Sequence, residues 1–142
     1  MTPRELEPGL FVSAQIQPGD IAVLKARGFR SLICNRPDHE EPDQPDSANM
    51  AQCAHEAGLA WASIPVTAAS LDEHDVQAYA KALQQMPRPI LAYCRSGNRC
   101  CVLWGLARAA DTPPDDLARR ASEAGYDLSA WMPRMRARAA AG

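Results

Sequence analysis

The sequence predicts a single α/β domain with a mainly parallel central sheet of about four or five strands flanked by helices. Short apolar runs alternate with helical patterns along the chain, and parallel strands require such helical crossovers. The length of 142 residues fits one domain spanning 1–142. Because 46% of the residues are hydrophobic, the chain has enough apolar side chains for a buried core.

The first half of the chain contains three predicted strands, each a short apolar run: 10–12, 30–34 and 60–66. One helix opens at Pro18 and a second spans 48–57, and each is followed by a glycine, which favours a helix end. Segment 35–47 carries three prolines and five acidic residues. We therefore expect a long acidic loop between the second strand and the second helix.

The second half of the chain contains one predicted strand and four predicted helices. Ser70 and Glu73 have the spacing of a capping box, which predicts a helix start at Ser70. Apolar residues continue at helical spacing to Met86, and a buried strand follows at 89–93. The remaining helices are expected at 100–110, at 115–124 and from 128 or 129 to 138.

The segment that joins the last strand to the next helix has the composition of an anion-binding loop. Cys94 ends the strand, and sites in parallel sheets form at the carboxyl ends of strands. The expected oxyanion-binding residues follow it directly: Arg95, Ser96, Gly97, Asn98 and Arg99. Consecutive backbone amides and the start of a helix favour a thiolate at Cys94, and the Arg99 fork can bind two oxygens. We predict Cys94 as the nucleophile and Arg99 as its catalytic partner.

Several motifs occur in one order along the chain, and the segments Asn35-Arg-Pro-Asp38 and Cys94-Arg-Ser-Gly-Asn-Arg99 are the most specific. Together they resemble the bacterial phosphatase-like domain family that also occurs fused to beta-lactamase-like hydrolases. The resemblance is strongest over 1–110. It implies a fold like the dual-specificity protein tyrosine phosphatases and a cysteine-dependent phosphatase-like hydrolase that acts on a phosphoester. The same family is also described as sulfur transferases.

Two departures from the phosphatase pattern keep other functions open. Protein tyrosine phosphatases typically have Cys-x5-Arg, whereas the spacing here is Cys-x4-Arg, which resembles the shorter loop of rhodaneses. A rhodanese-like sulfurtransferase carrying a Cys94 persulfide is therefore the main alternative, and a non-catalytic anion-binding or sensor domain is the second. In addition, Ala68 stands where dual-specificity phosphatases have their aspartic acid, so the usual general acid is missing.

Three further side chains are candidates for the site, each with a structural alternative. Asp38 is the candidate general acid, with the neighbouring Glu40 and Glu41 as substitutes, unless this is a solvated acidic loop. Arg36 either adds positive charge at the rim of the pocket or pairs with those acids. Cys100 either resolves an oxidised Cys94 as a disulfide or is a small core residue.

Charge and cysteine content limit the partners and the compartment. The net charge of −2 provides no basic field, so we expect a small anionic substrate or a phosphorylated molecule and neither nucleic acid nor a membrane. Five cysteines cannot complete a disulfide framework, and without a CxxC pair or clustered histidines no metal or cofactor is expected. These features predict a reduced, cytoplasmic protein. The sequence leaves the physiological substrate and the oligomeric state open.

Overall fold

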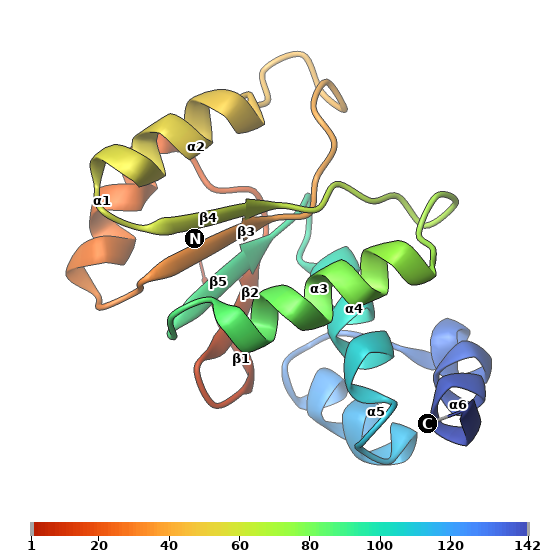
Figure 1. Cartoon of the computed structure of the whole chain (residues 1–142). Coiled ribbons are helices and arrows are strands. Elements are labelled where there is room, and N and C mark those ends of the chain that lie inside the picture. Colours follow the sequence, from red (N-terminus) through yellow and green to blue (C-terminus); the bar gives the residue numbers. More distant parts are fainter. Residues whose placement is uncertain (1, 142) are drawn as a thin grey trace.

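Five short strands form one sheet with the order β1-β2-β5-β3-β4 (Figure 1). Their bounds are β1 (Arg4–Glu7), β2 (Leu10–Ser13), β3 (Ser31–Cys34), β4 (Ala60–Ser63) and β5 (Ile90–Tyr93). In this computed structural model, which describes residues 2–141, β2, β5, β3 and β4 are parallel and β1 is antiparallel to β2. The predicted fold class, an α/β domain with a mainly parallel sheet, is confirmed.

The central strand β5 is hydrogen-bonded on both sides, to β2 and to β3. All of its residues are buried, because helices cover both faces of the sheet at this point. Ala92 lies opposite Val12 of β2 and Ile33 of β3, so three apolar side chains share one register position. The segment that follows Tyr93 therefore starts from the best-supported position in the sheet.

The helices divide into three groups. Their bounds are α1 (Pro18–Ala26), α2 (Ser47–Glu56), α3 (Glu73–Gln85), α4 (Asn98–Arg108), α5 (Pro114–Glu123), the short 3-10 turn η1 (Ser129–Trp131) and α6 (Met132–Ala141). Figure 1 shows α1 and α2 on one face of the sheet and α3 and α4 on the other. The helices α5 and α6 pack against α4. Among residues 2–141, no helix combines the length and apolar character that crossing a bilayer requires.

Each face of the sheet has its own hydrophobic core. On the α1 and α2 face, Leu24 and Met50 pack with Leu32 of β3. On the opposite face, the larger core contains the fully buried Trp104 of α4 and Tyr79 of α3. Since α4 belongs to this larger core along most of its length, the helix that starts at the cysteine loop is held rigidly.

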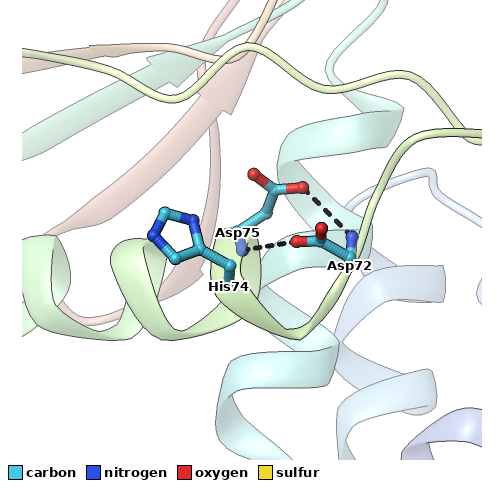
Figure 2. A group of neighbouring side chains, drawn as sticks. All are labelled: Asp72, His74 and Asp75. Atoms are coloured by element: carbon cyan, nitrogen blue, oxygen red, sulfur yellow. Dashed lines mark hydrogen bonds between the residues drawn. The ribbon is translucent and has the colours of Figure 1, made fainter.

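The predicted N-cap of α3, Ser70, is wrong by two residues. Asp72 is the N-cap: its side chain accepts the N–H of Asp75 at 3.1 Å, and the Asp75 carboxylate accepts the N–H of Asp72 at 3.0 Å (Figure 2). Ser70 instead bonds to Thr67 within the preceding turn. Asp72, His74 and Asp75 also lie close enough together to hold a metal, but the two carboxylates are explained by this reciprocal capping.

Candidate active site

Cys94 directly follows β5, and its sulfur lies inside the loop that leads to α4. The Gly97 N–H donates to Cys94 Sγ over 3.1 Å, and α4 begins one residue later at Asn98. The Cys94 side chain is 0% exposed. The thiol therefore lies at the base of the loop, at the carboxyl end of the central strand.

The environment of Cys94 stabilises its thiolate. The Cys100 thiol and the backbone N–H groups of Cys100, Ser96 and Gly97 lower the pKa of Cys94 to about 6, although burial opposes the shift. Burial, together with the neighbouring Cys94, raises the pKa of Cys100 well above its ordinary value. Cys100 thus stays protonated as a donor while Cys94 is mostly ionised at neutral pH.

Gly97 is required by the packing of a residue from far along the chain. Its φ of +95° lies in the left-handed region, which favours glycine. A Cβ at this position would lie 2.3 Å from the Tyr126 hydroxyl oxygen, and that hydroxyl donates to the Ser96 carbonyl at 3.4 Å. Tyr126, in the connection between α5 and η1, therefore supports the loop from outside.

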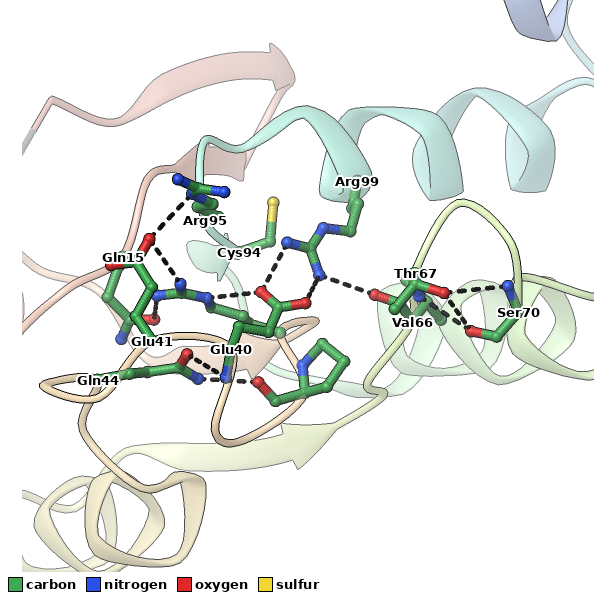
Figure 3. A network of polar contacts seen from close by, with 12 residues as sticks. Gln15, Glu40, Glu41, Gln44, Val66, Thr67, Ser70, Cys94, Arg95 and Arg99 are labelled. Atoms are coloured by element: carbon green, nitrogen blue, oxygen red, sulfur yellow. Dashed lines mark hydrogen bonds and ion pairs between the residues drawn. The ribbon is translucent and has the colours of Figure 1, made fainter.

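Arg99 reaches from the first turn of α4 toward Cys94 and is held by two other segments (Figure 3). Its Nη1 donates to Glu40 Oε2 at 2.8 Å and to the Val66 carbonyl at 3.0 Å, and its Nη2 donates to Glu40 Oε1 at 2.8 Å. The guanidinium is thereby fixed by the acidic loop after β3 and by the segment after β4.

Arg36 lies below the acidic loop, with its side chain only 3% exposed, and not at a solvent-exposed rim. Its Nε donates to Glu40 Oε1 at 2.8 Å and its Nη1 to Gln15 Oε1 at 3.0 Å, while Nη2 is 3.5 Å from a Glu41 oxygen. Arg99 first, and then Arg36, hold the pKa of Glu40 at about 2. Glu40 is therefore ionised near neutral pH and is a poor proton donor in this arrangement.

The remaining loop residues contribute backbone more than side chain. The Arg95 side chain extends into solvent, where its Nε is 3.1 Å from a Glu41 oxygen. The Ser96 hydroxyl oxygen accepts the Asn98 N–H at 3.3 Å. The backbone N–H of Asn98 is thus bonded within the loop. The backbone N–H of Cys100, and not that of Asn98, contributes to the lowered pKa of Cys94. Sequence reasoning missed that amide because Cys100 is outside the Cys-to-Arg motif.

Asp38, the predicted general acid, has both carboxylate oxygens engaged at the start of α2. Oδ1 accepts the Ser47 N–H at 2.8 Å, and Oδ2 accepts the Ser47 hydroxyl at 3.0 Å. In the same motif, Asn35 donates its side-chain amide to the Ile64 carbonyl at 2.9 Å. Asp38 and Asn35 therefore anchor the two ends of the acidic loop, and a proton-transfer role for Asp38 stays a prediction.

Residues 3–111 match the sequence family described as "Beta-lactamase hydrolase-like protein, phosphatase-like domain". The chain belongs to this family. Beta-lactamase hydrolase-like proteins of Xylella fastidiosa are 32% identical over 135 residues, and that of Agrobacterium fabrum is 32% identical over 133 residues. The alignments cover 92% and 90% of this chain but 31% of each relative, so the chain spans about a third of the length of its curated relatives.

Solved structures of phosphatases share the fold of this phosphatase-like domain. A candidate phosphatase from Neisseria meningitidis is 39% identical and superposes with a TM-score of 0.85 over 95% of this chain and 96% of that chain. Kinase-associated phosphatase, crystallised with serine in place of its catalytic-site cysteine, has a TM-score of 0.78 at 13% identity, covering 99% of this chain and 96% of that one. At that identity the likeness shows the fold alone, and the predicted phosphatase-like fold is confirmed.

Proposed function

We propose that this phosphatase-like domain is a cysteine-dependent hydrolase of a phosphorylated small molecule, with Cys94 as nucleophile. The observation that carries the proposal is the Cys94 thiol, which accepts the Gly97 N–H at 3.1 Å and has a pKa of about 6. Such a sulfur is ionised at neutral pH and faces backbone donors that can also bind phosphoryl oxygens. The five cysteines are free thiols, which fits a reducing compartment such as the cytoplasm.

The reaction has two displacements at phosphorus. The Cys94 thiolate attacks opposite the leaving oxygen, so an S–P bond forms while the P–O bond breaks and its electron pair departs with the leaving group. Arg99 and the loop amides bind the equatorial oxygens, where charge is concentrated. Water then attacks phosphorus, the S–P bond breaks, the thiolate is regenerated and inorganic phosphate leaves after losing a proton to solvent.

The leaving group is the weak point of this mechanism. Glu40 has a pKa of about 2, and the Asp38 carboxylate is engaged by Ser47. Protonation of the departing oxygen is typically worth ~10²–10⁴-fold in rate. We therefore expect aryl phosphates, whose phenolate leaves without a proton, to be turned over, whereas alkyl phosphates are turned over far more slowly.

Sulfur transfer is the second candidate function, and the short Cys-x4-Arg spacing favours it. In that reaction the Cys94 thiolate attacks the outer sulfur of thiosulfate, sulfite leaves with the electron pair, and a persulfide remains on Cys94. Cyanide then takes the outer sulfur as thiocyanate and restores the thiolate. A single sulfur atom needs less space within the loop than a phosphoryl group does.

Parallel assays with an activated aryl phosphate and with thiosulfate plus cyanide test the proposal. Phosphate release that disappears in Cys94→Ser supports the hydrolase, because a serine hydroxyl is far harder to ionise than this thiol. Thiocyanate formation without phosphate release would replace the hydrolase by the sulfurtransferase. Inactivity in both assays, with retained phosphate binding, would identify a non-catalytic anion-binding domain.

A further inference from the structure

Glu40 contacts two arginines of the site, Arg36 and Arg99, through its two carboxylate oxygens. Its Oε1 accepts from Arg36 Nε and from Arg99 Nη2, each at 2.8 Å, and its Oε2 accepts from Arg99 Nη1 at 2.8 Å. One carboxylate thus joins a buried arginine to the arginine beside the thiol (Figure 3). Charge-assisted bonds of this length are among the strongest hydrogen bonds in proteins.

The contacts of Arg99 show which part of its guanidinium remains for a substrate. A guanidinium has five N–H donors, and Glu40 and the Val66 carbonyl take three of them, all on the terminal nitrogens. Within residues 2–141, no acceptor is found for the Nε–H or for the second Nη2–H, and these two lie on one edge. Figure 3 shows this guanidinium between the Glu40 carboxylate and the Cys94 sulfur.

We propose that Glu40 is a positioning residue that fixes Arg99 so that its Nε–Nη2 edge faces an oxyanion held at Cys94. The proposal rests on the proposed function and assigns Glu40 a role in ground-state and transition-state binding, not in proton transfer. Two parallel N–H donors at a fixed angle match two oxygens of a tetrahedral anion. Buried Arg36 holds the carboxylate from the other side, so that Glu40 stays in place when an anion arrives.

The opposite role for Glu40 is that of an internal anion that competes with the substrate for Arg99. The two roles predict opposite changes in anion binding when Glu40 is substituted. If Glu40 were a competitor, Glu40→Gln would remove it and strengthen anion binding. Simple electrostatics gives the same sign, since the substitution removes a negative charge near an anion site. Positioning alone predicts that Glu40→Gln weakens anion binding despite the lost negative charge.

Protection of Cys94 by inorganic phosphate measures this directly and does not require turnover. The 142-residue chain is treated with iodoacetamide at increasing phosphate concentration, and Cys94 labelling is followed by mass spectrometry. Glu40→Gln should raise the phosphate concentration for half-protection by roughly 10- to 100-fold, as expected for a displaced binding group. Asp43→Asn, which removes one charge from an exposed position of the same loop, should leave half-protection unchanged.

Glu40→Asp separates geometry from charge, because it keeps the carboxylate and shortens the side chain by one methylene. We expect it to remain impaired, with a higher KM for the aryl phosphate than the native protein has. Equal or stronger phosphate protection in Glu40→Gln, or full recovery in Glu40→Asp, would overturn the positioning role. Failure of phosphate to protect the native thiol would instead overturn the proposed oxyanion site. Thermal melting checks that both variants fold.

Discussion

At the scale of single residues, the ionisation of Cys94 depends most on its neighbour Cys100. The Cys100 thiol lowers the pKa of Cys94 more than any other single group does, and Cys100 is itself fully buried. A buried S–H that donates to a thiolate has no water to replace it when it is removed. The redox role considered for Cys100 stays a prediction, but its donor role can be tested separately.

Cys100→Ala should therefore move the midpoint of Cys94 alkylation upward from a pH of about 6, because the largest stabilising contact is lost. Cys100→Ser restores a donor and should shift the midpoint less. Cys101→Ala is the matched control, since Cys101 is equally buried but is not a donor to Cys94. Iodoacetamide labelling across pH measures all three midpoints. An unchanged midpoint in Cys100→Ala would show that the backbone amides alone suffice.

A second residue-scale prediction concerns the contact between Gly97 and Tyr126. Gly97→Ala places a methyl group 2.3 Å from the Tyr126 hydroxyl oxygen and forces alanine into a positive φ, which alone costs about 1–2 kcal/mol. We expect a lower melting temperature and loss of turnover. Tyr126→Ala in the same chain should restore part of the stability, because it removes the clash but not the backbone strain. A double-mutant cycle by chemical denaturation measures the coupling. Strict additivity would contradict the clash.

The local part of the site could be predicted from sequence, and the distant part could not. Cys94, Gly97 and Arg99 lie within six consecutive residues, where a strand, a glycine and a helix start fix their relative positions. Glu40 contacts Arg99 across 59 residues, and Tyr126 contacts Ser96 across 30. No periodicity connects such pairs. Only the packing of the acidic loop and of the C-terminal helices brings them together.

At the scale of elements, the N-terminal strand β1 is joined to α4 by one half-buried carboxylate. Glu7 accepts the Trp104 Nε1–H at 2.7 Å and both the Nε and Nη2 groups of Arg108 at 2.8 Å, and Arg88 Nη2 lies 3.0 Å away. Although burial raises it, the Arg108 and Trp104 hydrogen bonds hold the pKa of Glu7 below its ordinary value. The edge strand is therefore tied to the helix that carries Arg99.

Glu7→Gln should lower the free energy of unfolding at pH 7 by about 1–3 kcal/mol, because charged hydrogen bonds are replaced by weaker ones. The pKa of Glu7 is depressed on folding, so its contribution is present above the ordinary value of 4.5 and is lost as the pH falls below it. The free energies of unfolding of Glu7→Gln and of the native protein should thus become equal in acid. Denaturant unfolding at several pH values measures this, with exposed Glu5→Gln in the same strand as the control. A difference that persists in acid would contradict an ionic origin.

The strand β1 also shows where element prediction from sequence fails. Its residues, Arg4-Glu-Leu-Glu7, include only one fully buried side chain, Leu6, so there is no apolar run to detect. It forms because Glu7 and Leu6 gain partners in α4 and the larger core, which local sequence does not encode. The buried parallel strands were predicted because burial on both faces requires continuous apolar residues.

At the scale of the whole molecule, the C-terminal helices complete the core on the α4 side. The family match ends at residue 111, yet Leu117, Leu128 and Met135 are buried in the same core as α4. The loop support from Tyr126 comes from this region too. The packed core therefore extends beyond the residues that the family model matches.

The central position of β5 has a further consequence for how the protein opens. Amide protons of a strand bonded on both sides exchange with solvent only when the whole fold unfolds, whereas surface loops exchange through local opening. We expect hydrogen–deuterium exchange to be slowest at 90–93 and fast at 38–46, and phosphate to slow exchange in the loop without changing β5. Cys94 would thus be attached to the last segment to open, whereas Arg99 would be steadied by a loop that opens among the first. Native-state fluctuations would then release the anion long before they displace the thiol.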